Sequence, residues 1–188
     1  PVITLLGSAT ETVEAKGTYT DAGASASDML DGSLTVISLS TVSTDVVGIY
    51  SVIYSVSDTN GNAATDVVRT VSVVDTTKPV ITLLGSATET VEAKGTYEDA
   101  GASASDTLDG SLTVTSASTV NIDEVGIYTV TYSVSDANGN AAADAVRVVN
   151  VVDTTKPVIT ILGNATETVE AKGTYTDAGA SASDMLDG

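Results

Sequence analysis

The stretch Val73–Thr82 reads VVDTTKPVIT and sets the organisation of the whole chain. The same residues return at Val151–Thr160, and the chain opens on the matching PVIT of Pro1–Thr4, so equivalent prolines are 78 residues apart. Proline fixes φ, favours extended backbone in the residue before it and cannot donate to a β-ladder, which suits the first position of a strand. The stretch therefore predicts a strand that ends one module, a short hinge and a strand that opens the next.

This period divides the chain into a module at residues 1–78, a second module at 79–156 and a partial module at 157–188 that holds N-terminal strands only. The net charge of −18 is spread over all three parts, which carry −6, −8 and −4. Such an acidic chain excludes nucleic acid as a partner, because phosphates must be neutralised by lysine and arginine. It also disfavours anionic membranes and attracts cations.

Cysteine and histidine are both absent from the sequence. Their absence excludes disulfides, thiolate or histidine metal sites, and catalysis by a serine–histidine pair or an imidazole base. We therefore expect this segment not to be an enzyme, with no catalytic residues and no organic cofactor. It also has no apolar run long enough to span a bilayer, so we expect no membrane insertion in this segment.

Short runs of β-branched or alternating residues predict strands throughout each module. In the first module the expected strands cover residues 2–6, 10–15, 19–28, 34–39 and 49–58, with a less regular edge strand at 41–47 and a return strand ending at residue 74. Asn60-Gly61 predicts a hairpin turn before the return strand. No segment has helical periodicity over a useful length, so the pattern indicates a small antiparallel β-sandwich.

A comparison of the two full modules predicts which face of each strand is buried. They differ at 14 of 78 positions. Ile53 becomes Thr131 in the second module, whereas Tyr54 on the opposite parity is kept as Tyr132. Burying a threonine hydroxyl without a partner is unfavourable, so the variable parity should face solvent and the retained parity should form the core.

Four motifs of this period resemble a known family. They are Asp75–Leu83, Tyr19–Ala24, Gly48–Asn62 and Arg69–Asp75, each repeated 78 residues on where the chain continues. The pattern resembles the bacterial immunoglobulin-like repeats of large surface proteins, which also occur in some pesticidal crystal proteins and are related to hyalin-type repeats. The resemblance implies an all-β fold of tandem Ig-like antiparallel β-sandwich modules, located outside the cell or on the bacterial cell surface.

Carboxylates at strand ends and turns are candidate ligands for Ca²⁺, which takes six to eight oxygen ligands. The alternative is a solvated acidic surface, and Asn60 and Asn62 fit a simple turn better than a calcium loop. Arg69, on the inward parity, is expected to form a structural ion pair with a carboxylate. The candidate calcium ligands are Glu14, Asp21, Asp28, Asp31, Asp58 and Asp75 in the first module, and Glu92, Asp99, Asp106, Asp109, Asp136 and Asp153 in the second.

The preferred function is a structural one: a calcium-stiffened spacer in an adhesin stalk or extracellular filament, with roughly 35–45 Å of length per module. The expected partners are neighbouring repeats and other copies of the chain. Residues 157–188 lack the strands that would cover them, so either further sequence of the same chain or another chain, through strand addition, is expected to complete them. Two alternatives stay open. The modules could bind a glycan or receptor through their loops, or they could be accessory domains of a secreted enzyme.

Overall fold

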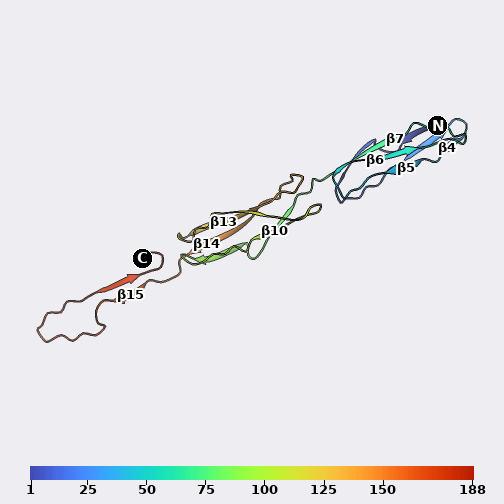
Figure 1. Cartoon of the computed structure of the whole chain (residues 1–188). Helices are drawn as coiled ribbons and strands as arrows, with labels where there is room; N and C mark the ends of the chain where they lie inside the picture. The colour runs from blue at the N-terminus through green and yellow to red at the C-terminus, as the bar shows by residue number, and fades with distance from the viewer. The chain divides into compact units, whose positions relative to one another are not determined.

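The computed structural model describes residues 1–188 and consists of strands, turns and loops (Figure 1). It contains no helix that could cross a membrane. The chain forms two compact units that do not follow the sequence period. The first unit comprises residues 1–80, 104–113 and 134–142, and the second comprises 81–103, 114–133 and 143–188. Two segments of the second repeat therefore belong to the same compact unit as the first repeat.

The first repeat folds into two sheets that enclose a thin apolar core. The core takes Ile3 and Ala26 from the smaller sheet and Val52, Tyr54 and Val56 from the larger one and its extension. The smaller sheet has the order β1-β3-β4 and contains β1 (Val2–Leu5), β3 (Ala24–Asp28) and β4 (Gly32–Leu34). The larger has the order β2-β7-β6-β5 and contains β2 (Thr10–Glu14), β5 (Ile37–Ser40), β6 (Gly48–Ser55) and β7 (Val67–Val74). All pairs are antiparallel except β2 with β7, which is parallel.

The second repeat has the same two sheets one period later. One has the order β11-β10-β8 and contains β8 (Val80–Leu83), β10 (Ala102–Asp106) and β11 (Gly110–Leu112). The other has the order β12-β13-β14-β9 and contains β9 (Thr88–Glu92), β12 (Thr115–Ser118), β13 (Gly126–Ser133) and β14 (Ala145–Val152). In the partial repeat, β15 (Val158–Ile161) pairs with β16 (Ala180–Ser183). The expected all-β fold of repeated sandwich modules is thus confirmed.

The faces predicted from the differences between the repeats are also confirmed. Tyr54 and Val71, on the retained parity, are almost completely buried, at 1% and 0% exposed. Ile37 and Leu39, on the variable parity, are 67% and 65% exposed. The second repeat can therefore carry threonine and alanine at those two positions without placing a polar group in the core.

Four strand predictions were wrong in their extent. The strand expected at residues 49–58 ends at Ser55, where β6 stops. Residues 34–39 form parts of two strands, because β4 pairs with β3 in one sheet and β5 pairs with β6 in the other. The chain crosses between the sheets there, and both halves keep strand-like composition, so the sequence pattern does not reveal the crossing. Residues 41–47 form no strand, and β3 begins only at Ala24, because Gly23 has a left-handed φ of 81°.

Candidate functional site

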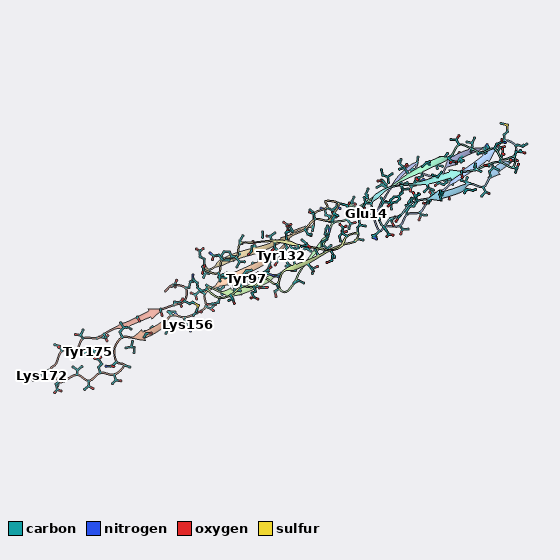
Figure 2. The ribbon with its side chains drawn as sticks, in the orientation of Figure 1. Glu14, Tyr97, Tyr132, Lys156, Lys172 and Tyr175 are labelled. Carbon is teal, nitrogen blue, oxygen red and sulfur yellow. The ribbon has the colours of Figure 1, made fainter.

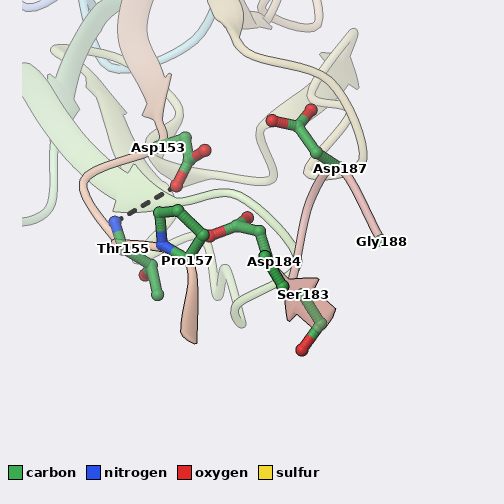
Figure 3. Close-up of a pocket in the computed structure, with 8 residues that line it drawn as sticks. Asp153, Thr155, Pro157, Ser183, Asp184, Asp187 and Gly188 are labelled. Atoms are coloured by element: carbon green, nitrogen blue, oxygen red, sulfur yellow. Dashed lines mark hydrogen bonds between the residues drawn. The ribbon is translucent and has the colours of Figure 1, made fainter. Parts of the chain in front are cut away.

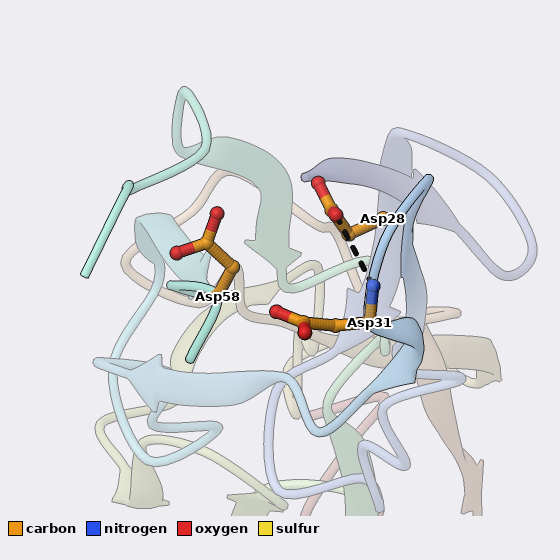
Figure 4. Close-up of side chains that lie close together, drawn as sticks. All are labelled: Asp28, Asp31 and Asp58. Atoms are coloured by element: carbon orange, nitrogen blue, oxygen red, sulfur yellow. Dashed lines mark hydrogen bonds between the residues drawn. The ribbon is translucent and has the colours of Figure 1, made fainter. Parts of the chain in front are cut away.

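The chain contains three clusters of three aspartates, and within each cluster the carboxylate oxygens lie within 4.8 Å of one another. Equivalent members are 78 residues apart, so the three clusters are partial copies of one arrangement. It draws one aspartate from just before the hinge, two from the turn between the second and third strands of the smaller sheet, and one from the loop after the long central strand. The clusters are Asp28, Asp31 and Asp58 (Figure 4); Asp75, Asp109 and Asp136; and Asp153, Asp184 and Asp187 (Figure 3).

In the second cluster, local turns fix two parts of the arrangement. Asp106 ends β10, and its Oδ1 accepts hydrogen bonds from the backbone N–H groups of Leu108 at 2.7 Å and Asp109 at 3.2 Å. Asp136 follows β13, and its Oδ1 accepts from the N–H groups of Asn138 at 3.0 Å and Asn140 at 2.7 Å. Aspartate favours such turns because its short side chain can bond the backbone two residues ahead.

Asp75 joins this cluster from the preceding repeat, and all of these residues lie in the first compact unit. The side-chain amide of Asn138 donates to Asp75 Oδ2 at 2.9 Å, and that of Asn140 donates to the Asp75 carbonyl at 3.1 Å. Our sequence reasoning assigned the equivalent Asn60 and Asn62 to a turn alone and missed this second role. The available signal was the run of oxygen-bearing side chains at alternate positions, 58, 60 and 62.

Two carboxylates of this cluster and the adjacent Asp106 are buried, whereas Asp109 is exposed, and the basic residues that form ion pairs are paired elsewhere. Asp75, Asp106 and Asp136 are 9%, 8% and 8% exposed. Burial raises the pKa of Asp136, but hydrogen bonds, foremost those from Asn140, outweigh it and lower the pKa, so this side chain is anionic at neutral pH. Lys16, Lys94, Arg69 and Arg147 contact carboxylates outside the cluster.

Glu14 and Glu92 hold the hinge, and the structure does not bring these two predicted calcium ligands into the aspartate clusters. Glu14 accepts hydrogen bonds from the N–H and hydroxyl of Thr76 at 2.7 and 2.8 Å, and from those of Thr77 at 3.0 and 2.8 Å. Glu92 binds Thr154 and Thr155 in the same way. These donors occupy the carboxylate oxygens that a metal would need.

The hinge contact makes the titration of Glu14 a direct test of its geometry. The backbone N–H of Thr76, followed by the two threonine hydroxyls, lowers the pKa of Glu14 to about 2 from an ordinary 4.5. Because the folded pKa is depressed, the contribution to stability is present above pH 4.5 and is lost as the pH falls towards 2. NMR titration of the side-chain carboxyl should show this midpoint.

Replacing Thr76 and Thr77 together with alanine should raise the Glu14 midpoint towards 4.5, since the hydroxyl donors disappear and the hinge loosens. Glu92 is the matched control, because its own donors are Thr154 and Thr155 and its pKa is also lowered to about 2. The titration midpoint of Glu92 should not change in the Thr76/Thr77 variant. A Glu14 midpoint near 4.5 in the unaltered chain would contradict the hinge geometry.

Asp21 and Asp99, two more of the predicted calcium ligands, lie outside the aspartate clusters, and each pairs with the buried arginine of its own repeat. Arg69 is completely buried and its guanidinium binds the Asp21 carboxylate, which confirms the expected structural ion pair. In the second repeat, Asp99 binds Arg147 and accepts hydrogen bonds from Tyr97 and Tyr132, which lie near each other in Figure 2. These contacts join the two carboxylates to the core.

Comparison with known proteins agrees with this fold. Residues 3–73 and 81–151 match the model of a family described as "Bacterial surface protein, Ig-like domain". The chain belongs to this family. The two matched segments are the two full repeats, so each is an Ig-like module of a bacterial surface protein, as the sequence motifs indicated.

The Ig-like modules are also similar to the sea-urchin protein hyalin. Hyalin of Strongylocentrotus purpuratus is 33% identical over 137 residues, which cover 68% of this chain and 11% of hyalin. The chain thus spans a small part of that relative. Among solved structures, a similar one is the M60 catalytic domain with the CBM51-1 and CBM51-2 domains from Clostridium perfringens ZmpB. It has a TM-score of 0.44 and 14% identity, and the match covers 88% of this chain and 33% of that one.

Proposed function

We propose that the chain is a spacer segment of an extracellular bacterial surface protein, in which consecutive Ig-like modules are joined stiffly. The observation that carries this proposal is the bonded hinge. Thr76 and Thr77 donate to Glu14 through both backbone N–H groups and both hydroxyls, and Thr154 and Thr155 do the same to Glu92. A flexible linker would leave these groups to water.

An apolar contact at the same end of the module supports stiffness. Leu186, in the partial repeat, packs against the core cluster of Ala93, Val149 and Val151 in the second repeat, and all four belong to the second compact unit. The equivalent Leu30 of the first repeat is 80% exposed. Full burial of a leucine side chain contributes on the order of 1.5–3 kcal/mol, and Leu186, which is partly buried, gains a share of this, which favours a fixed joint over a freely turning one.

The composition of the exposed surface favours a spacer role over a glycan-binding role. Tyr175 is the one aromatic residue among the exposed large hydrophobic side chains. Protein surfaces that bind ligands tightly are enriched in tyrosine, tryptophan and arginine, and both arginines here are buried. The solvent-facing strand positions instead carry serine, threonine and isolated aliphatic residues, which suit a module whose role is to set a distance.

The proposal predicts a narrow distance between equivalent points of the two full modules. The chain has no cysteine, so Ser38→Cys and Ser116→Cys can carry spin labels without background, and both positions are exposed. Pulsed electron–electron double resonance should give one narrow distribution of distances between the two labels, because the hinge fixes the joint between the modules. Glu14→Ala should broaden it by freeing Thr76 and Thr77.

Lys16→Ala is the matched control for this experiment. Lys16 lies two residues from Glu14 but contacts Asp45 at 2.8 Å, away from the hinge threonines. Its removal should leave the distance distribution narrow. A broad distribution of label distances in the otherwise unaltered chain, in the presence of millimolar calcium, would overturn the spacer proposal. It would then favour the alternatives, ligand binding or an accessory domain of an enzyme.

A further inference from the structure

A buried carboxylate oxygen without a partner lies beside the second aspartate cluster. Asp106 is 8% exposed, and its Oδ2 is buried and makes no hydrogen bond. Oδ2 of the equivalent Asp184 is buried and unpartnered too, and Asp184 is itself a member of the third cluster. Leaving an anionic oxygen buried without a donor or a cation is costly.

A positive charge beside this oxygen would satisfy it. In the second repeat, Lys94 pairs with Asp123, and Arg147 pairs with Asp99 and Glu89, so neither forms an ion pair with Asp106. A cation therefore fits where the second repeat leaves the oxygen bare.

We propose that Asp75, Asp106, Asp109 and Asp136 form a Ca²⁺ site to which two consecutive repeats contribute. Asp75 comes from the first repeat and the other three from the second, and all four belong to one compact unit. This inference rests on the proposed function in one respect, because an ion bound here ties a module to the one before it and stiffens the spacer.

The geometry of the carboxylates fits calcium. Ca²⁺ binds oxygens at 2.3–2.6 Å, so two oxygens on the same ion are at most about 5 Å apart. The oxygens of Asp75, Asp109 and Asp136 lie within 4.8 Å of one another. The residues equivalent to Asp106 are Asp28 and Asp184. Their carboxylate oxygens lie within this same distance of the other members of the first and third clusters. Four carboxylates with water supply the six to eight oxygens that calcium takes, whereas Mg²⁺ usually binds one or two carboxylates and keeps its waters.

The third cluster lines a cavity. Asp153, Asp184 and Asp187 border a volume of about 180 Å³ together with Thr155, Pro157 and neighbouring residues (Figure 3). Because water occupies about 30 Å³ in the liquid, the carboxylates of this cluster leave space for an ion and water.

The proposal predicts a tight, saturable calcium site in this chain. Since calcium affinity rises with the number of charged ligands, a calcium titration of the chelator-treated full chain should show a tight site where Asp75, Asp106, Asp109 and Asp136 come together. Isothermal titration calorimetry at about 0.15 M salt, where diffuse surface attraction is screened, is the suitable measurement.

Two single substitutions test the contribution from both repeats. Asp75→Asn and Asp136→Asn should each weaken the tight site at least tenfold, although they change different repeats. Asp144→Asn is the matched control, because it removes the same charge from an exposed residue outside the cluster. It should change the affinity less than twofold. Should Asp136→Asn disturb the turn and fail to fold, Asp109→Asn gives the same test at an exposed ligand.

The melting temperature supplies a second readout, because a ligand that binds only the folded state raises it. Millimolar calcium should raise it by several degrees in the unaltered chain and in Asp144→Asn, but not in Asp75→Asn. Equal weakening by all the aspartate variants would show attraction to the acidic surface alone and would overturn the site. An unchanged melt between chelator and calcium would overturn it as well.

The site and the spacer can fail separately. A narrow distance between labels at Ser38→Cys and Ser116→Cys, with no saturable calcium binding, would overturn the site and leave the spacer proposal standing. Tight binding that is lost in Asp75→Asn, together with a broad distance distribution in calcium, would support the site and overturn the stiff spacer.

Discussion

Replacing Arg69 with alanine is expected to destabilise the first module by about 3–5 kcal/mol, because it removes a buried guanidinium and leaves the partly buried carboxylate of Asp21 without its partner. Arg69 is completely buried. Its guanidinium binds Asp21 and the carbonyl of Leu6, its Nε donates to the carbonyl of Ser8 at 2.9 Å, and its Cζ lies 5.7 Å from the centroid of the Tyr54 ring. One side chain thus ties the larger sheet to the loops that flank the smaller one.

Lysine at this position should not restore stability. It carries a charge but lacks the planar fork of donors that reaches several oxygens at once. Burial raises the pKa of Asp21, but the hydrogen bonds from Tyr54 and the Gly23 backbone and the charge of Arg69 outweigh it and lower the pKa. Asp21 is therefore anionic, and an uncompensated anion is the main cost of the substitution.

A double-mutant cycle separates this cost from lost packing. The double variant Arg69→Ala/Asp21→Ala should lose less stability than the sum of the losses in the two single variants. This is because Asp21→Ala removes the carboxylate that Arg69→Ala leaves unpaired. Hydrogen exchange read by mass spectrometry can follow each module, since the peptides of β6 and β13 differ in sequence at Ser51/Thr129 and Ile53/Thr131. Additive effects of the two substitutions would contradict the coupling.

The core residues could be predicted from the sequence because the two full repeats can be compared with each other. Ile53 and Tyr54 are neighbours of similar hydrophobic character, and composition alone does not say which is inside. The change of Ile53 to Thr131 in the next repeat, with Tyr54 kept as Tyr132, resolves the question. It does so because a core position tolerates a buried hydroxyl poorly.

The same reasoning could not sort the carboxylates. Glu14, Asp21 and Asp75 all lie near strand ends in the sequence, yet one binds the hinge threonines, one binds Arg69 and one meets aspartates of the next repeat. The partner that each carboxylate meets depends on how the sheets stack and on where the chain crosses between them. The crossing after β4 was itself hidden, because Leu34–Leu39 has the composition of one continuous strand.

Tyr54→Ala is expected to destabilise the first module by about 3–5 kcal/mol, as large-to-small changes of buried aromatic residues do. Tyr54 is 1% exposed, packs in the core with Val52 and Val56, and its hydroxyl donates to Asp21 at 2.5 Å. Tyr54→Phe keeps the ring and removes the hydroxyl, so it should cost about 1.5–3 kcal/mol, the range for a hydrogen bond to a charged group.

Ile53→Thr is the control for this series, because the second module already carries Thr131 at the equivalent position. Its cost should stay below about 1 kcal/mol, since Ile53 is only partly buried on the solvent-facing parity. Urea unfolding followed by hydrogen exchange in β6 and β7 measures all three variants. Equal losses for Tyr54→Ala and Ile53→Thr would mean that the two faces of β6 are wrongly assigned. A loss for Tyr54→Phe as large as that for Tyr54→Ala would instead place most of the stabilisation in the Asp21 network, and only a small part in the packing of the ring.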